Sequence, residues 1–379
     1  MDTEQLVASQ FTLNDDIIYL NHAAVSPWPA NTSQAVCDFA RQNSEQGSLQ
    51  YPQWLETETR LRDDIRKLIN APSKDDIALV KNTSEALSLV AYGIDWQPGD
   101  NVVITNQEFP SNRIVWESLK NRGVELRVAN VSDWDNPSPE QQVIDQCDAR
   151  TRLVSVSSVQ YATGLKMQLA TIGEHCHAND ILFCVDAIQS VGAVDFDVQK
   201  IKADFAMADG HKWMLGPEGL AFFYCAGHVR DALNVTQYGW HMVEDMGNFD
   251  AKDWEPARSA RRFECGSPNM LCIHALQASV SFILQVGIDY IEARIRQNTQ
   301  RMLEQIQNHA QLQVLSPTHL EQLAGIITFK RRDKSSAELF QQLKENHVFC
   351  AERGGGIRFS PHFYTTPEKI DHAIKVASR

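Results

Sequence analysis

The sequence lacks the features that mark membrane, secreted and nucleic-acid-binding proteins. Among its 379 residues, no apolar run approaches the length of a bilayer span, and the N-terminus lacks the basic, apolar and small-residue succession of a signal peptide. The eight cysteines include no CxxC pair. With 35 Lys and Arg against 48 Asp and Glu, the formal net charge is −13, which disfavours nucleic acid. We therefore expect a cytoplasmic protein with reduced thiols and no membrane or nucleic-acid partner.

The remaining composition is that of a globular protein with more than one structural unit. Hydrophobic residues make up 43% of the chain and charged residues 22%. From residue 76 to residue 225, apolar segments of strand length alternate with helical patterns, as in "NVVITN" followed by "SNRIVWESLKNRG". Because nearly continuous apolar strands between helices are typical of parallel sheets buried on both faces, we predict a doubly wound, mainly parallel α/β domain.

The texture changes after about residue 265. Two long helical patterns, at 271–287 and 288–310, are followed by short strands and a further helix at 336–347. This predicts a smaller C-terminal α+β domain at 266–379, a large α/β domain at 31–265 and a turn-rich N-terminal arm at 1–30.

Polar residues follow several of the apolar strands, and reactive groups in such sheets collect at the carboxyl ends of strands. Thr83 and Ser84 lie where a strand gives way to a helix, so they suit either an anion site or an ordinary helix cap. Asp186 ends another apolar strand, where a carboxylate needs a cation or a donor, although it too suits a helix cap.

Lys212, in "ADGHKWMLGPEG", follows a third apolar strand and stands next to His211. A lone lysine is usually a solvated surface charge, but an amine desolvated near another cation loses its proton easily and acts as a nucleophile or Schiff-base former. "RRFECGSPN", with Ser267, is either a further site segment or a plain loop. The combination of a strand-end acid and a strand-end lysine suggests a cofactor with a pyridine nitrogen and an aldehyde.

The chain resembles the pyridoxal-phosphate-dependent class V aminotransferase family, in the branch of cysteine desulfurases and isopenicillin-N epimerase-like proteins. The resemblance runs from "YLNHAAVSP" to "SPHFYTTPEKID", and its motifs are "NTSEAL", "QEFPSN", "VDAIQS", "GHKWMLGPEG", "RFECGSPN" and "IRFSPHFYTT". It implies a fold-type I pyridoxal-phosphate enzyme, a homodimer with shared active sites, that acts at the α-carbon of an amino acid or amine as a transaminase, epimerase or lyase.

The resemblance also implies roles for individual residues. Lys212 would hold the cofactor as an internal aldimine and move the substrate proton, while Asp186 would pair with the pyridinium nitrogen. Gln189 would lie near the ring's phenolic oxygen, and Ser267 would reach the phosphate across the dimer interface. The full predicted cofactor set is Thr83, Ser84, Glu85, Phe109, Tyr161, Asp186, Gln189, Asp209, His211, Lys212 and Ser267; the predicted substrate-binding residues are Arg358 and Asn21, and no metal site is predicted.

Three positions and one segment depart from the desulfurase pattern. Phe109 stands where desulfurases usually carry a histidine over the ring, Tyr161 where an asparagine is common, and Asp209 where a small residue is usual. The segment before Arg358 is too short for the loop that carries the catalytic cysteine, so Cys350 is expected to be a buried structural thiol.

Two alternatives remain at this level. One keeps the cofactor and makes the chain a cysteine desulfurase or selenocysteine lyase. The other, of a different class, is a dinucleotide-binding oxidoreductase or a non-catalytic binding protein on the same scaffold. The second alternative lacks a GxGxxG motif after the first strand.

Overall fold

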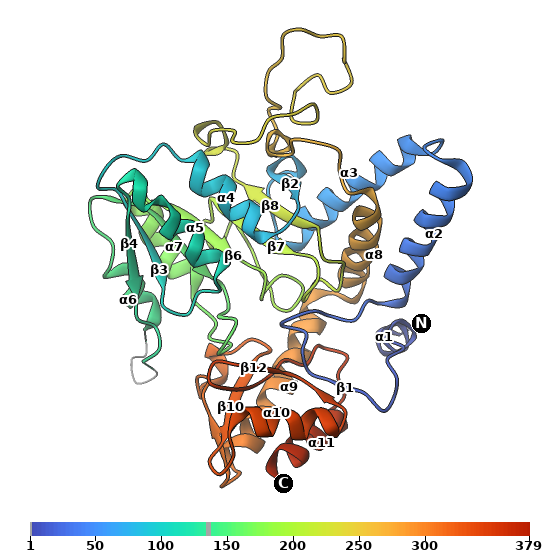
Figure 1. Cartoon of the computed structure of the whole chain (residues 1–379), viewed down its shortest axis with the longest axis vertical. Helices are drawn as coiled ribbons and strands as arrows, with labels where there is room; N and C mark the ends of the chain where they lie inside the picture. The colour runs from blue at the N-terminus through green and yellow to red at the C-terminus, as the bar shows by residue number, and fades with distance from the viewer. Residues whose placement is uncertain (1, 134–137) are drawn as a thin grey trace.

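The computed structural model describes residues 2–133 and 138–379, and a seven-stranded sheet in the order β2-β8-β7-β6-β5-β3-β4 forms its centre (Figure 1). The strands are β2 (Ile77–Val80), β3 (Asn101–Thr105), β4 (Glu125–Ala129), β5 (Thr151–Ser157), β6 (Leu182–Asp186), β7 (Phe205–Asp209) and β8 (Ala221–Cys225). Neighbours from β7 to β4 pair in parallel, whereas β8 is antiparallel to both β2 and β7. The sheet is therefore mainly parallel, as the apolar runs predicted.

Both faces of this sheet are buried across its central strands, which explains why those strands are largely apolar, whereas the edge strand β4 is partly exposed and carries Glu125 and Arg127. On β3, Val102 and Ile104 belong to one hydrophobic core, whereas Val103 between them belongs to another. The helices between these strands are α4 (Thr83–Gly93), α5 (Ser111–Glu117), α6 (Pro139–Ile144) and α7 (Leu169–Ala178). Short 3-10 helices occur at Lys74–Asp76, Ser118–Arg122, Arg230–Ala232, Ala260–Phe263 and Leu320–Gln322.

Long helices connect this sheet to a second, smaller one. α8 (Met270–Val286) packs against α2 (Ala30–Gln46) and α3 (Tyr51–Leu68), and α9 (Ile288–Gln307) leads away from it. The second sheet is antiparallel, in the order β12-β13-β10-β9, and lies beneath the first in Figure 1. Its strands are β9 (Leu312–Val314), β10 (Ile327–Arg331), β12 (Ala351–Arg353) and β13 (Gly356–Phe359). The same part of the chain contains the helices α10 (Ser336–Glu345) and α11 (Pro367–Ser378).

The predicted fold class, a mainly parallel α/β sheet with a smaller C-terminal α+β part, is confirmed. A third core, which includes Phe329 and Phe359, fills the smaller part. The domain limits at residues 30 and 265 stay predictions.

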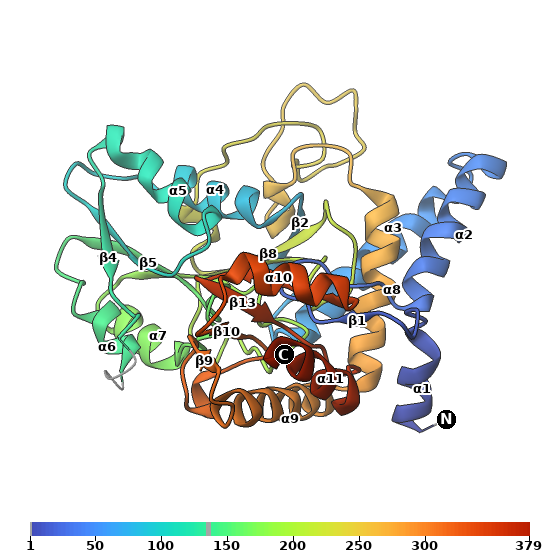
Figure 2. The same ribbon diagram turned by 60° about the horizontal axis from the view of Figure 1, so that its bottom comes forward.

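The N-terminal arm joins the two parts. After α1 (Thr3–Gln10), β1 (Ile18–Tyr19) pairs in parallel with β11 (Val348–Phe349), and the arm then crosses toward the large sheet (Figure 2). The Ser26 amide donates to the carbonyl of His211 at 2.8 Å, and the Trp28 indole donates to the carbonyl of Gly216 at 3.0 Å. The arm therefore fixes the C-terminal part relative to the segment that carries Lys212.

The described helices were also compared with the requirements of a membrane span. None of them alone combines sufficient length with sufficient apolarity; α8 and α9 meet the requirement only as a pair, and an 83° bend separates them.

Candidate functional site

A cavity of about 250 Å³ lies at the carboxyl ends of β6 and β7. Residues distant in sequence meet here: the arm, the start of α4, the β7–β8 connection and the β12–β13 hairpin all contribute. The predicted site residues that line it are Thr83, Ser84, Phe109, Tyr161, Asp186, Gln189, Asp209, His211, Lys212 and Arg358. The others, Glu85, Asn21 and Ser267, do not line it.

Lys212 projects into this cavity from the connection between β7 and β8. A hydrogen bond from the Gly210 amide to the carbonyl of Leu220, at 3.0 Å, closes the base of that connection. Gly192, whose φ is +91°, packs closely against this connection, and a Cβ on Gly192 would lie 2.4 Å from the carbonyl oxygen of Trp213. Lys212 is only 8% exposed, and burial lowers the pKa of its amine.

Asp186, the last residue of β6, supplies the charge opposite to that of Lys212. It is 2% exposed and accepts a hydrogen bond from the Ile188 amide at 3.1 Å. Burial raises the pKa of Asp186, and the nearby ammonium of Lys212 opposes that rise. The carboxylate in turn favours the protonated form of the lysine, so each group sets the ionisation of the other.

Two aromatic rings form a wall beside the amine. The Nζ of Lys212 lies 5.5 Å from the ring centroid of Phe109, and the edge of Tyr161 meets Phe109 with centroids 5.1 Å apart. This wall offers a flat apolar face on which a planar ring can stack.

The start of α4 presents hydrogen-bond donors to the cavity. Asn82 caps the helix by accepting from the Glu85 amide at 2.8 Å, and the Glu85 carboxylate accepts from the Lys81 amide at 2.5 Å. Glu85 therefore acts in the cap, outside the cavity. The buried hydroxyl of Thr83 has no hydrogen-bond partner among the described residues, and Ser84 donates to the hydroxyl of Ser111 at 2.8 Å. Free donors at a helix start favour an anion.

Asp209 and His211 lie next to that helix start. The Asp209 Oδ1 accepts the Thr83 amide at 2.9 Å, and its Oδ2 lies 3.6 Å from the Nδ1 of His211, which has no hydrogen-bond partner. Burial raises the pKa of Asp209 to about 6 and lowers the pKa of His211 to about 4. His211 is therefore uncharged at neutral pH.

Arg358 on β13 forms the opposite side of the cavity. It is 2% exposed, donates through Nη1 to the carbonyl of Tyr161 at 2.7 Å, and its Nε has no partner. Burial, together with the positive charge of Arg353, lowers the pKa of Arg358 to about 10. This buried guanidinium suits a planar carboxylate.

Arg353 also lines the cavity, although the sequence reasoning missed it. Ala351 pairs with Arg358 across the β12–β13 hairpin, and Arg353 lies two residues beyond Ala351 on the same strand. The period of two therefore places both arginines on one face of the sheet. That hairpin periodicity in "AERGGGIRF" was the available signal.

Gln189 ties the arm to the lysine-bearing connection. Its Nε2 donates to the carbonyl of Ala23 at 3.1 Å, and its Oε1 accepts from the indole of Trp213 at 2.7 Å. Asn21 forms an isolated parallel β-bridge with Ser360, and its buried Oδ1 has no hydrogen-bond partner among the described residues. The arm residues Ala23, Ala24 and Val25, together with Ser111 and Glu218, line the cavity without having been predicted.

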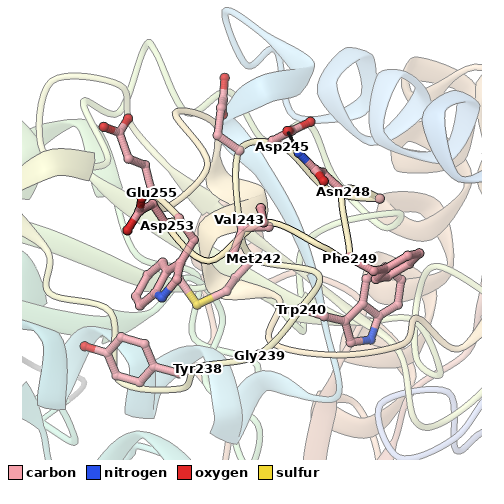
Figure 3. Close-up of a pocket in the computed structure, with 14 residues that line it drawn as sticks. Tyr238, Gly239, Trp240, Met242, Val243, Asp245, Asn248, Phe249, Asp253 and Glu255 are labelled. Atoms are coloured by element: carbon pink, nitrogen blue, oxygen red, sulfur yellow. Dashed lines mark hydrogen bonds between the residues drawn. The ribbon is translucent and has the colours of Figure 1, made fainter.

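A larger hollow of about 810 Å³ lies away from this site, in the excursion of residues 238–255 at the top of Figure 1. Its aromatic and acidic lining, including Tyr238, Trp240 and Asp253, comes from that one segment (Figure 3). It contains none of the residues around Lys212. The exposed Ser267 follows the excursion in the chain and lines neither hollow.

At the base of the excursion, Glu58, His241 and Glu264 place ligand-type atoms within 4.8 Å of one another, as in some metal sites. Arg62, however, pairs with both glutamates there, including a bond from its Nη2 to Glu264 Oε2 at 2.8 Å. The guanidinium thus supplies the positive charge that these carboxylates need.

Comparisons with known proteins point to one family. The family model for class-V aminotransferases matches residues 18–372. A probable cysteine desulfurase of Methanothermobacter thermautotrophicus is 31% identical over 98% of this chain and 96% of the relative. An isopenicillin N epimerase of Streptomyces clavuligerus is 27% identical over 95% of this chain and 94% of the relative. The structure of a C-DES mutant with glycine linked to its pyridoxal-phosphate cofactor superposes with a TM-score of 0.89, at 21% identity, over 100% of this chain and 99% of that one.

The Asp186–Lys212 geometry predicts how the reactivity of the amine responds to substitution. Asp186→Asn removes a charge that favours the ammonium, so the pKa of Lys212 falls further and more of the amine is neutral at pH 7. Competitive acetylation of the cofactor-free protein between pH 6 and 9, read by peptide mass spectrometry, should show Lys212 labelling faster at pH 7, by about tenfold for each unit of pKa shift.

Exposed Lys252 serves as the internal control, because its labelling should not change. Asp209→Asn should also lower the pKa of Lys212, but by less, since Asp209 favours the ammonium more weakly than Asp186 does. An unchanged Lys212 profile in Asp186→Asn, or one displaced to higher pH, would contradict the coupling.

Proposed function

Because this chain belongs to the class-V aminotransferase family, whose enzymes use pyridoxal phosphate, we propose that Lys212 bonds the cofactor and that the enzyme acts at the α-carbon of an amino acid or amine. One observation carries the proposal: a desolvated amine and a buried carboxylate share a cavity at the strand ends. The family predicted from the motifs is confirmed, which sets the dinucleotide-binding alternative aside.

The cavity fits each part of the proposed cofactor. Lys212 supplies the amine for the aldehyde, Asp186 supplies a carboxylate for the ring nitrogen, and Phe109 supplies a face for the ring. Thr83 and His211 hold buried polar atoms without partners beside the start of α4, which suits the phosphate. When bound, the cofactor supplies an electron sink for charge that develops at the α-carbon.

Arg358 is proposed to bind the substrate's carboxylate, with Arg353 adding positive potential and Asn21 supporting this side from the arm. A guanidinium held by its bond to the Tyr161 carbonyl presents its remaining donors in a fixed direction. Fixing the substrate's carboxylate orients the bonds of its α-carbon toward Lys212. Burial favours the neutral amine of Lys212, which can accept the proton from the α-carbon.

The reaction proposed first is transamination, epimerisation or non-desulfurase elimination. The relative named isopenicillin N epimerase supports epimerisation, and C-DES, described as a cystine C–S lyase, supports elimination. All three reactions require the same groups: Arg358 to bind the substrate carboxylate, the amine of Lys212 to accept a proton, and the aromatic wall beside it.

The central test of the proposed function is covalent capture of the cofactor. Pyridoxal phosphate added to the purified protein should produce a visible absorption band, and borohydride should fix the cofactor on Lys212, as read by peptide mass spectrometry. Lys212→Ala should abolish this fixation and lower turnover by roughly 10³-fold, because it removes both the bond and the proton carrier. A wild-type protein that binds no pyridoxal phosphate would overturn the proposal.

Cysteine desulfurase is the second candidate, because a relative at 31% identity carries that name. The thiol of Cys350, which precedes Ala351, the residue paired with Arg358, does not support it. Cys350, between β11 and β12, is 7% exposed, does not line the cavity, and burial raises its pKa to about 12. A nucleophilic sulfur acceptor needs exposure and thiolate character, and Cys350 has neither.

Cys350→Ala tests this candidate directly. If the enzyme releases alanine from cysteine at all, the rate should stay within about twofold of wild type, because a buried thiol at an ordinary core site acts only through packing. Alanine and sulfide formation are measured, with Cys37→Ala, at an exposed position, as the matched control. A selective loss of alanine formation in Cys350→Ala would favour the desulfurase.

We further propose that the chain works as a homodimer in the cytoplasm. All eight cysteines are free thiols, which suits a reducing compartment. The excursion of residues 238–255 exposes large apolar side chains, with Phe249 79% and Trp254 56% exposed, and such a patch marks an interaction surface. Ser267 is exposed and follows this excursion further along the chain, and we propose that its hydroxyl serves a second copy's site.

Sedimentation velocity tests the dimer. The wild-type protein should sediment as a dimer at micromolar concentration, and Phe249→Asp combined with Trp254→Asp should produce monomers, because charges placed in an apolar interface are costly to desolvate. Leu49→Asp, at a 74% exposed position on the chain's α2–α3 turn, is the matched control and should remain dimeric. A monomeric wild type would contradict the proposal.

A further inference from the structure

Asp209 places a carboxylate where the proposed site needs to receive an anion. It ends β7, and its Oδ1 already accepts the amide of Thr83, the first residue of α4. Its side chain is 13% exposed and lines the cavity. A phosphate bound at this helix start would therefore have a carboxylate as its direct neighbour.

Two further observations show that this helix start is built for a ligand. Within the described part of the chain, the hydroxyl of Thr83, a residue 4% exposed, has no hydrogen-bond partner, and neither does the Nδ1 of His211. Both residues line the cavity together with Ser84. The Thr83 hydroxyl and the His211 Nδ1 are thus both available to a ligand, whereas the Thr83 amide is already engaged by Asp209.

The charges that face Asp209 offer little compensation for a second anion. On the β7–β8 connection, Lys212 is favourable, Glu218 is unfavourable, and His211 is uncharged at neutral pH. Asp186 on neighbouring β6 adds a further unfavourable carboxylate. Of the remaining neighbours, α4 contributes the uncharged Thr83 and Ser84 and holds Glu85 in its cap, and β8 contributes Ala221, which pairs with Asp209 in register. Arg353 and Arg358 also line the cavity, on the side opposite the start of α4.

Lys212 cannot serve as a lasting counter-charge either, since the proposed function commits its amine to the cofactor aldehyde. A dianionic phosphate beside an ionised Asp209 would meet like-charge repulsion in a desolvated site. Protonation removes this repulsion and converts the acceptor into a donor. Burial raises the pKa of Asp209 to about 6 even though the Thr83 amide and Lys212 lower it, and a neighbouring anion raises it further.

We propose that Asp209 takes up a proton from solvent when the cofactor's phosphate binds, and then donates its O–H to a phosphate oxygen as a neutral carboxylic acid. The inference rests on the proposed function, because it takes pyridoxal phosphate as the ligand. No covalent bond changes at Asp209; one O–H forms, and the acid's carbonyl oxygen remains free to accept the Thr83 amide. Phosphate binding is then linked to one proton and tightens as the pH falls.

The test compares proton uptake in the full-length, cofactor-free protein. Calorimetry in two buffers of different ionisation enthalpy counts the protons taken up on binding pyridoxal phosphate, for wild type and for Asp209→Asn. Asparagine keeps an acceptor for the Thr83 amide and a donor for phosphate, but it does not titrate. The proton changes at Lys212 and on the phosphate itself are common to both proteins, so their difference isolates Asp209.

We expect the wild type to take up about one proton more than Asp209→Asn at pH 7.5, and its affinity to fall more steeply above pH 7, by up to about tenfold per pH unit. Pyridoxal, which lacks the phosphate, should show no such difference. Asp204→Asn is the matched control: Asp204 precedes the same strand, accepts the Phe183 amide at 2.8 Å, and has a pKa raised by burial, but lies outside the cavity.

Three outcomes would overturn the inference. Equal proton counts in wild type and Asp209→Asn would show that Asp209 stays ionised, and the same difference with pyridoxal would show that phosphate is not the cause. A difference that Asp204→Asn reproduces would assign it to the strand as a whole. Failure of the wild type to bind either aldehyde would instead overturn the proposed function itself.

Discussion

The site depends on two opposite charges that are withdrawn from water together. Asp186 and Lys212 are both nearly inaccessible, and each moderates the cost of burying the other. Removing one partner of such a pair leaves an uncompensated charge in a medium that solvates it poorly. The arm, the aromatic wall and the hairpin arginines enclose this pair, so their positions follow from the need to exclude water while keeping one face open to a ligand.

Much of this site was predictable because its chemistry follows a simple sheet rule. Asp186 ends one apolar strand and Lys212 comes shortly after another, and parallel strands bring their carboxyl ends to one edge. The α4 start was predictable for the same reason. The family motifs then added Arg358 to the predicted site. Arg358 lies on the separate C-terminal sheet, so its position could not be predicted from the strand ends of the large sheet.

Other features were not predictable, because they depend on contacts rather than on local pattern. The reversed direction of β8 is one, since a strand buried on both faces has the same apolar sequence in either direction. The bond between Asp209 and the Thr83 amide joins segments 126 residues apart. Arg353 enters the cavity only because a tight hairpin returns the chain beside Arg358, and the role of Glu85 as a cap depends on the Lys81 amide.

The pairing of β1 with β11 also has a consequence for biosynthesis. Ile18 leaves the ribosome long before its partner, Val348. During translation the arm therefore has no strand to join, and the apolar surface around Leu20 stays uncovered until the segment that carries β11 has emerged. The nascent large sheet can pack before this point, so a ribosome-bound chain acquires its scaffold first and closes its site only after β11 is available.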